Sequence, residues 1–448
     1  MKPSHGDARA RAADVLVRVA SDDAFAAPLL DAALDRAPAL DPRDRALCTE
    51  LVYGVLRTQP ALDEALGRHA RDGASSLRRL DPFALASMRV AAYQILALQR
   101  VPPSAAVDAA VGAVRRARSP GLAGFVNAVL RKLSAERPAT LPDDARVTLA
   151  LRSVPPRARA RLVGLLGDEG ADACLRAMFT RTPAVSLRVN LTRTTREALA
   201  ARLLTELPGA QVTLGARAET ALLVVGGGDP TRAAAWREGL FAIQEEGAQA
   251  VCALAEARPG MRVLDACAGV GGKSATLAMA LRGDGLLHSA DLFPEKLPRL
   301  GATLAREGID AGLVQGVFAA DLSKGLGALG AALPEGGYDL AMVDAPCSGL
   351  GTLAHRPDLL LRLRDDAQWE ALCALQGEIL ARVADCVRPG GALVYAVCTL
   401  TREESDDVVA RFRAAHPAWT VTRRLVLRTD VDGTDGFVAV RLSRAAST

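Results

Sequence analysis

The segment LDACAGVGGKSATLA, from Leu264 to Ala278, joins the end of an apolar strand to the start of a helical pattern. Gly269, Gly271 and Gly272 let the backbone between them turn tightly and approach a ligand closely. A buried strand, a glycine-rich turn and a helix together form the unit with which many α/β domains bind nucleotide-like ligands. This stretch therefore predicts an α/β domain that binds a ligand where the strand ends.

From about residue 240 onward, short apolar runs alternate with helical patterns such as those over 295–307 and 365–387. The strand candidates are RVLDAC, LLHSAD, AGLVQG, LAMVD and ALVYAVC. Near-continuous apolar strands that alternate with helices are typical of a mostly parallel, doubly wound sheet covered on both faces. We expect a Rossmann-like domain over 240–448, with its ligand at the carboxyl ends of the strands.

The preceding half of the chain predicts two other regions. Residues 1–135 show only helical periodicity, as in ALASMRVAAYQILAL and GFVNAVLRKL, and predict an all-α domain. Residues 136–239 begin with a proline- and arginine-rich connector, followed by an alternating strand over 185–190 and a threonine-rich helix start. They predict a linker and a small α+β subdomain. A multi-domain chain agrees with a length of 448 residues.

The charge balance permits a nucleic-acid partner without requiring one. The net charge is +4, and the region 1–135 holds 19 basic against 14 acidic residues. That region is therefore the better candidate for docking RNA. The chain has only five lysines, but its arginines are spread over the whole sequence. A GC-rich genome explains this bias better than phosphate recognition does.

Cysteine usage and hydropathy limit the possible environment. None of the eight cysteines forms a C-x-x-C pair, so we expect no structural zinc and no other metal site. Charged residues such as Arg9, Asp14 and Arg18 interrupt the start of the chain, which argues against a secretory leader. No uncharged apolar run reaches the roughly 18 residues that span a bilayer. We expect a cytoplasmic protein with free thiols and no membrane partner.

The glycine-rich turn can be interpreted in several ways. A dinucleotide fingerprint needs a third glycine where Ser274 stands, and a phosphate-binding P-loop needs a glycine where Cys267 stands. An adenosyl cofactor without pyrophosphate, S-adenosylmethionine, fits better than either, and a plain structural turn is the alternative. Asp291, 20 residues after Gly271, is placed to bind ribose hydroxyls. Asp321 suits either the adenine amino group or a helix N-cap.

Two cysteines end neighbouring predicted strands. Cys347 lies in VDAPCSGLGT and Cys398 in VYAVCT, and in a doubly wound sheet both thiols would face one pocket. A lone buried cysteine is usually inert packing. We keep that interpretation for Cys48, Cys174, Cys252, Cys373 and Cys386. A pair at adjacent strand ends, with one member inside D-A-P-C-S-G, favours chemistry.

Paired thiols suit methylation of a pyrimidine. Carbon 5 of cytosine is a poor nucleophile, but a thiolate that adds to carbon 6 makes the ring enamine-like and able to attack a methyl group. A base must then remove the carbon-5 proton, and an acid near ring nitrogen 3 stabilises the developing charge. Asp344 could do so if it is protonated or shares a proton with the base. Pro346 fixes the turn between Asp344 and Cys347.

These motifs resemble the RNA cytosine carbon-5 methyltransferase family over residues 240–443. LDACAGVGGKS, VDAPCSGLGT and GGALVYAVCT look like its cofactor loop, its D-A-P-C-S segment and its late T-C segment. VPPSAAVDAAVGAVRRARSPGLAGFVNAVLRKL resembles the NusB-type RNA-binding domain that precedes the catalytic domain in the small-subunit subfamily. The resemblance implies 16S rRNA, or an early small-subunit assembly intermediate, as the partner. We expect the protein to act as a monomer.

The resemblance also implies residue roles. Cys398 would be the nucleophile, Cys347 would assist product release, and the cofactor would contact Cys267, Ala268, Gly269, Val270, Gly271, Gly272, Lys273, Asp291, Asp321 and Asp344. This sequence departs from the family pattern at three places. Val270 replaces a proline, Val397 replaces a threonine, and AHRPDLLLR keeps Pro357-Asp358 but lacks the usual lysine. The third departure concerns contacts to the substrate strand.

Other functions remain as alternatives. One alternative is methylation of a cytosine in another ribosomal or transfer RNA, but the NusB-like region argues against it. A non-catalytic RNA-binding assembly factor is another, disfavoured by the intact Asp344, Cys347 and Cys398. A small-molecule methyltransferase would need neither paired thiols nor a basic helical domain.

Overall fold

A computed structural model describes residues 8–22, 24–71, 73–117, 120–180, 184–362 and 365–446. The chain divides into two compact units. Unit 1 comprises residues 1–159, 175–181 and 353–363, and unit 2 comprises 160–174, 182–352 and 364–448. The small antiparallel sheet and the large sheet therefore share one unit, and a short segment of the second half of the chain belongs to the first.

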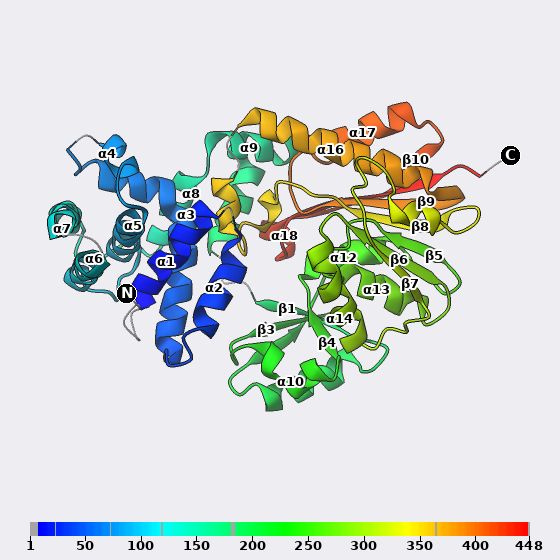
Figure 1. Ribbon diagram of the computed structural model, residues 1–448, viewed down its shortest axis with the longest axis horizontal. Helices are drawn as coiled ribbons and strands as arrows, with labels where there is room; N and C mark the ends of the chain where they lie inside the picture. Colours follow the sequence, from blue (N-terminus) through cyan, green and yellow to red (C-terminus); the bar gives the residue numbers. More distant parts are fainter. Residues whose placement is uncertain are drawn as a thin grey trace. The chain divides into compact units, whose positions relative to one another are not determined.

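Unit 1 is built from helices (blue to cyan in Figure 1). Asp41 and Asp81 cap two of them, each followed by a proline in the first turn, because a carboxylate satisfies the free N–H groups and proline needs no donor there. Their apolar faces form one buried cluster, which confirms the predicted all-α fold. The helices are α1 (Ala8–Ser21), α2 (Ala26–Asp35), α3 (Pro42–Gly67), α4 (Ala74–Arg78), α5 (Pro82–Ala97), α6 (Pro103–Ala117), α7 (Pro120–Ala135) and α8 (Ala145–Ser153).

The helix α9 (Pro156–Thr180) runs through both units and is interrupted at Gly167, whose φ of 72° is not helical. A glycine tolerates that conformation without steric cost. The break lies within the part of α9 that belongs to unit 2.

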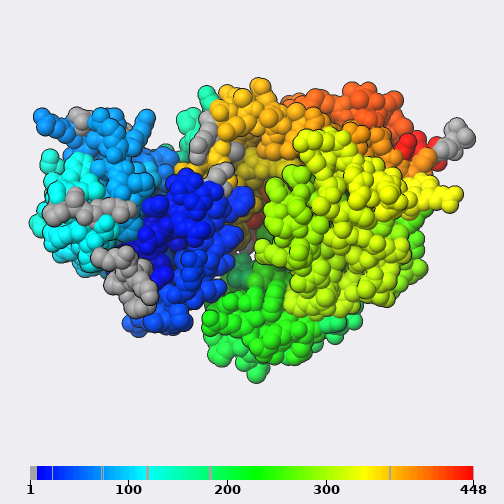
Figure 2. Space-filling model, in the orientation of Figure 1, coloured from blue at the N-terminus to red at the C-terminus, as the bar shows by residue number. Residues whose placement is uncertain are grey.

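The small sheet of unit 2 is antiparallel and has the order β2-β3-β1-β4. Leu187, Leu222 and Phe241 from three of its strands share a buried core with Leu199 of the covering helix. In Figure 2 this subdomain (green) adjoins the yellow-green part of the same unit. Its elements are β1 (Val185–Val189), α10 (Arg196–Glu206), β2 (Gln211–Leu214), β3 (Ala221–Val225), η1 (Pro230–Arg232), α11 (Ala234–Arg237) and β4 (Phe241–Ile243).

The large sheet has the order β10-β11-β9-β8-β5-β6-β7, in which the last five strands pair in parallel and β11 pairs antiparallel with both β9 and β10. This confirms the predicted mostly parallel, doubly wound sheet. The chain leaves β5 toward β6 on one side and later returns to β8 on the other, and ligands bind in the crevice at such a switch point. The strands are β5 (Arg262–Asp265), β6 (Leu286–Asp291), β7 (Val314–Ala319), β8 (Tyr338–Asp344), β9 (Val387–Val397), β10 (Trp419–Leu427) and β11 (Phe437–Arg444).

Helices cover both faces of this sheet. In Figure 1, α12, α13 and α14 lie on one side and α16 and α17 on the other. The helices of this part are α12 (Glu246–Leu254), α13 (Gly272–Leu281), α14 (Leu297–Arg306), α15 (Ala328–Ala331), α16 (Asp366–Asp385), α17 (Asp406–Ala415) and α18 (Thr429–Asp432). Short 3-10 turns are η2 (Pro294–Lys296), η3 (Leu350–Thr352) and η4 (Pro357–Leu361).

One strand lies further along the chain than its apolar pattern indicated. The run AGLVQG predicted a strand over 311–316, whereas β7 spans Val314–Ala319. β7 is an edge strand, and most of its residues are only partly buried. An edge strand that is only partly buried has fewer apolar residues than a central strand, so its position in the sequence is harder to predict.

Candidate active site

The cofactor loop follows β5 and has the backbone that its glycines predicted. Gly269 and Gly271 have φ values of 57° and 90°, in the region that favours glycine. Gly271 caps the start of α13, and a Cβ on it would lie 2.9 Å from Leu300 Cγ of α14. The loop is therefore held tightly between two helices. Val270, at the position of the family's proline, is 41% exposed.

Asp291 ends β6 and faces this loop. Its Oδ2 accepts a hydrogen bond from the Gly269 N–H at 2.8 Å, and its Oδ1 accepts from the Phe293 N–H at 2.9 Å and from Lys296 Nζ at 3.2 Å. A carboxylate has about four acceptor positions, so this anchored side chain retains capacity for a further donor such as a hydroxyl.

Asp321 follows β7 and holds a local turn. Its carboxylate accepts from the Ser323 N–H and hydroxyl and pairs with Lys324 at 2.9 Å, and these hydrogen bonds lower the pKa of Asp321. The next helix, α15, begins only at Ala328. The helix N-cap interpretation of Asp321 is therefore wrong, because its side chain closes a turn instead.

Lys273 and Asp344 form an ion pair across the site. Lys273 lies in the first turn of α13, and its Nζ is 2.5 Å from Asp344 Oδ2 at the end of β8. Burial lowers the pKa of Lys273, but Asp344 and other nearby acidic groups outweigh it and the net shift is upward. The lysine is thus a charged proton donor in contact with Asp344. The sequence placed both residues near the cofactor but did not predict this pairing.

Asp265, at the end of β5, was not predicted as a site residue. It is fully buried, and its Oδ2 accepts from the Ser274 hydroxyl at 2.7 Å. Its Oδ1 is buried without a hydrogen-bond partner among the described residues. Burial raises its pKa to about 6. The Cys267 N–H also acts on this carboxyl group and lowers its pKa. Buried polar atoms are rarely left unpaired, so Oδ1 has capacity for a further donor beside the cofactor loop. The sequence signal that could have identified Asp265 is its place at the end of a predicted strand, just before the glycine-rich turn.

The structure brings the two predicted cysteines together. The Sγ atoms of Cys347 and Cys398 are 3.2 Å apart, both are free thiols and both are partly exposed. The hydrogen bond to Cys398, followed by burial, raises the pKa of Cys347 well above its ordinary value. Cys347 is therefore a thiol that can donate to the neighbouring sulfur. Val397, at the position of the family's threonine, is fully buried in β9.

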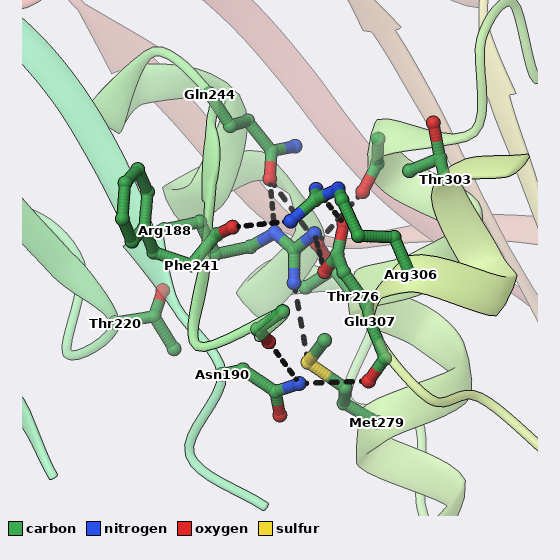
Figure 3. Close-up of polar contacts among 12 residues, drawn as sticks. Arg188, Asn190, Thr220, Phe241, Gln244, Thr276, Met279, Thr303, Arg306 and Glu307 are labelled. Carbon is green, nitrogen blue, oxygen red and sulfur yellow. Dashed lines mark hydrogen bonds and ion pairs between the residues drawn. The ribbon is translucent and has the colours of Figure 1, made fainter. Parts of the chain in front are cut away.

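A buried arginine of the small sheet lies at the centre of a network of polar contacts (Figure 3). Arg188 on β1 is fully buried; its Nε donates to Gln244 Oε1 and its Nη2 to Glu307 Oε2, both at 2.6 Å. Gln244 Oε1 also accepts from Thr276 Oγ1 on α13 at 3.3 Å. The Asn190 amide donates to the Glu307 carbonyl at 2.9 Å.

These contacts join the small subdomain to both helices that hold the glycine-rich turn. α13 begins at that turn, and α14 packs Leu300 against it before reaching Glu307 at its carboxyl end. Neither Arg188 nor Glu307 was predicted as a functional residue. Their pairing joins residues 119 positions apart, which periodicity does not detect.

One cleft of unit 2 is distinct from the predicted cofactor site. It has a volume of about 990 Å³ and is lined by residues such as Thr220, Gln249, Cys252, Met279 and Asp310. Neither of the paired cysteines nor any predicted cofactor residue is among its described lining residues. Within the described ranges, no group of His, Cys, Asp and Glu is arranged to hold a metal ion, and no helix is long and apolar enough to cross a membrane.

A helical first region, a doubly wound sheet of this order and a glycine-rich turn beside paired thiols define a NusB-type domain joined to a Rossmann-like methyltransferase domain. Residues 6–135 match the NusB family, and residues 252–435 match the 16S rRNA methyltransferase RsmB/F family. This chain belongs to the RsmB/F family of rRNA methyltransferases.

Curated relatives align over most of their length. The probable ribosomal RNA small subunit methyltransferase B of Synechocystis sp. is 32% identical over 408 residues, which cover 89% of this chain and 86% of that protein. The ribosomal RNA small subunit methyltransferase B of Pseudomonas putida is 30% identical over 458 aligned residues, covering 98% and 99% of the two chains.

Two solved structures share the fold at lower identity. The crystal structure of PH0851 has a TM-score of 0.82 and 23% identity, and the match covers 99% of this chain and 100% of that one. NSun6 from Pyrococcus horikoshii with SFG has a TM-score of 0.57 and 17% identity, covering 66% of this chain and all of that one.

Proposed function

We propose that this enzyme transfers a methyl group from S-adenosylmethionine to carbon 5 of a cytosine in 16S rRNA, through a covalent bond between Cys398 Sγ and carbon 6. The single observation that carries the proposal is the 3.2 Å approach of the Cys347 and Cys398 sulfurs beside Asp344. Membership of the RsmB/F family supports the RNA substrate.

The residues around the glycine-rich turn fit S-adenosylmethionine. The loop from Cys267 to Lys273 would cradle it, Asp291 would accept from its ribose hydroxyls, and Asp321 would accept from its adenine amino group. The buried Oδ1 of Asp265, which has no hydrogen-bond partner among the described residues, would accept from the ammonium group of the cofactor. When bound, the cofactor supplies an electrophilic methyl group on sulfur.

The protein residues would divide the reaction between addition and elimination. The Cys398 thiolate forms the bond to carbon 6, while the Lys273–Asp344 pair supplies a hydrogen bond or proton at ring nitrogen 3 as negative charge develops there. Carbon 5 would then be nucleophilic enough to bond to the methyl group as the methyl–sulfur bond of the sulfonium breaks and leaves a neutral thioether. A base removes the carbon-5 proton, the carbon 6–sulfur bond breaks, and the ring double bond returns. Cys347, held as a thiol, would hydrogen-bond to the departing sulfur.

The test compares cysteine variants on a 16S rRNA substrate. Cys398→Ala should abolish methyl transfer while calorimetry still detects S-adenosylmethionine binding. Cys347→Ala should accumulate a covalent protein–RNA adduct on denaturing gels, because addition proceeds and elimination does not. Cys373→Ala is the matched control, since Cys373 is also a partly buried cysteine but lies on α16. An adduct with Cys398→Ala and none with Cys347→Ala would reverse the two roles.

The alternative substrate is a cytosine in another ribosomal or transfer RNA. Bisulfite mapping of RNA from a strain that lacks this protein distinguishes the two, because the unmodified cytosine identifies the natural target. We further propose that residues 1–135 dock the RNA, that 136–239 form the linker and small subdomain, and that 240–448 catalyse the transfer in a monomer.

A further inference from the structure

The two reactive sulfurs lie on separate loops of the large sheet. Cys347 follows β8, Cys398 follows β9, and the two residues are 51 positions apart in the chain. Their approach to 3.2 Å therefore requires contacts that hold one loop against the other. Some of these contacts are direct: the Gly351 N–H donates to the Cys398 carbonyl at 3.1 Å, and the Ser348 and Thr399 hydroxyls are 3.0 Å apart. A further network of side-chain contacts between the two loops centres on Glu404, a residue that the mechanism does not use.

Glu404 is a fully buried carboxylate that binds the loop of Cys347. Its Oε2 accepts from the Ser348 N–H at 2.8 Å, and its Oε1 accepts from the Ser348 hydroxyl at 2.6 Å. On its own loop, Oε1 also accepts from Thr401 Oγ1 at 3.0 Å. The residue after the first cysteine is thus attached at two atoms to the loop that follows the second.

Two further side chains fix Glu404 itself. Gln376 on α16 donates from its Nε2 to Glu404 Oε2 at 3.1 Å and to the Pro346 carbonyl at 2.9 Å. The Tyr395 hydroxyl on β9 donates to the Glu404 carbonyl at 2.6 Å. Residues on both sides of Cys347 are consequently bound to one network. A buried charge is costly unless several donors compensate it, and four donors bind this carboxylate, so the network orders the segments on which the donors lie.

We propose that Glu404 is a positioning residue for the methyl transfer, which fixes the Cys347 loop on the Cys398 loop so that both sulfurs reach one pyrimidine ring. The roles of the sulfurs rest on the proposed function, whereas the positioning rests only on the contacts above. Small displacements of reacting groups, of about 1 Å, can lower rates by about 100-fold.

The experiment uses thiol cross-linking as a measure of position. Diamide oxidises two neighbouring thiols to a disulfide and takes up both hydrogens, so the rate at which Cys347 and Cys398 cross-link reports their proximity without RNA or cofactor. Peptide mapping identifies the product among the eight cysteines. In parallel, kcat and KM for 16S rRNA methylation and the affinity for S-adenosylmethionine are measured on the same full-length variants.

Glu404→Ala should slow the cross-link at least tenfold and lower kcat about 100-fold, with KM and cofactor affinity within twofold of the unchanged protein. Glu404→Gln should be intermediate, because its amide keeps one acceptor. Glu378→Gln, an exposed residue on α16, is the matched control and should change neither rate. If Glu404→Ala does not fold, Ser348→Ala removes one of the bonds and should shift both rates in the same direction.

A change in the ionisation of Cys347 cannot explain slower cross-linking in Glu404→Ala. After the Cys398 hydrogen bond and burial, the charge of Glu404 is one of the influences that raise the pKa of Cys347. Its removal would favour the thiolate and speed the cross-link, which is opposite to the expected result.

A folded Glu404→Ala variant with unchanged cross-linking and kcat would overturn the inference while leaving the proposed function intact. Glu404-dependent cross-linking in a protein that methylates no cytosine would instead support the positioning and refute the function.

Discussion

At the scale of single residues, Asp265 has incomplete hydrogen bonding, which affects the stability of the free protein and cofactor binding in opposite directions. Its carboxyl group is fully buried, with one oxygen bonded to Ser274 and the other unpartnered among the described residues. Burial makes such a group easier to protonate in the free protein than in the unfolded chain. A donor on the cofactor would reverse that effect, so the residue should be unfavourable for folding and favourable for binding.

Asp265→Asn should therefore stabilise the free protein near neutral pH and weaken S-adenosylmethionine binding. Burial raises the pKa of Asp265 from 3.8 to about 6, so the folded state holds this proton more tightly than the unfolded chain. Protonated Asp265 therefore contributes about 3 kcal/mol to the free energy of unfolding below about pH 4, and this contribution is lost as the pH rises through about 6. Unfolding followed at pH 4.5 and 7.5 should show a gain from the substitution that is larger at pH 7.5.

Asp284→Asn is the control for this comparison because Asp284 is exposed. It removes a carboxylate from the surface and should change the free energy of unfolding less than Asp265→Asn does at pH 7.5. A destabilised Asp265→Asn variant at pH 7.5 would contradict the assignment of burial as the dominant influence on this carboxyl group.

At the scale of elements, the cofactor site depends on a subdomain outside the large sheet. Arg188 of β1 connects to α13 through Gln244 and to the end of α14 through Glu307. These two helices enclose the glycine-rich turn. The small sheet should therefore influence cofactor affinity without contacting the cofactor.

Arg188→Met should destabilise the protein by about 3 kcal/mol, since it removes a partner from the fully buried Glu307. It should also weaken S-adenosylmethionine binding measured by calorimetry. Adding Glu307→Gln should recover part of the stability, because the uncompensated charge is then gone. Arg202→Met is the control in the same subdomain, as Arg202 pairs with Glu238 near the surface. Equal losses for Arg188→Met and Arg202→Met would show that the buried network has no special role.

The elements also show what could be predicted from the sequence. The central parallel strands and the glycine-rich turn were predictable, because each depends on residues that are close together in the sequence. A buried strand needs a continuous apolar run, and a tight turn needs glycines at particular positions. β10 and β11 were not anticipated. β10 is an outer strand with mostly exposed residues, including Arg423 and Arg424, so it lacks an apolar run. Glu404 and Arg188 were missed because their partners lie 56 and 119 positions away.

At the scale of the whole molecule, the two units are not consecutive in sequence. Residues 353–363, which follow the Cys347 loop, belong to the helical unit. There Arg57 donates to the Ala354 carbonyl at 2.6 Å, and Arg356 and Arg362 lie over the ring of Phe25. The segment in which this sequence departs from the family pattern is therefore packed against helical residues.

This arrangement determines how the RNA-binding role of the first region should be tested. Deleting residues 1–135 would remove Arg57 and Phe25 and leave the segment 353–363 without these partners. A loss of RNA binding would then have two causes. Substitutions of exposed basic residues avoid this difficulty, because they leave the helical core and its contacts in place.

Four exposed basic residues lie at the carboxyl ends of α6 and α7: Arg115, Arg116, Arg131 and Lys132. Their joint replacement by glutamine should weaken binding to a 16S rRNA fragment and flatten its salt dependence. RNA binding releases counterions in proportion to the number of phosphates that the protein neutralises. Each phosphate contact that is lost should therefore reduce the magnitude of the slope of log K against log salt by about 0.7 to 0.9. Replacing four exposed arginines of unit 2, Arg232, Arg237, Arg258 and Arg411, changes the net charge equally and is the control. If fluorescence anisotropy over a range of KCl concentrations gives the same slope for both variants, the helical unit has no preferred role in docking RNA.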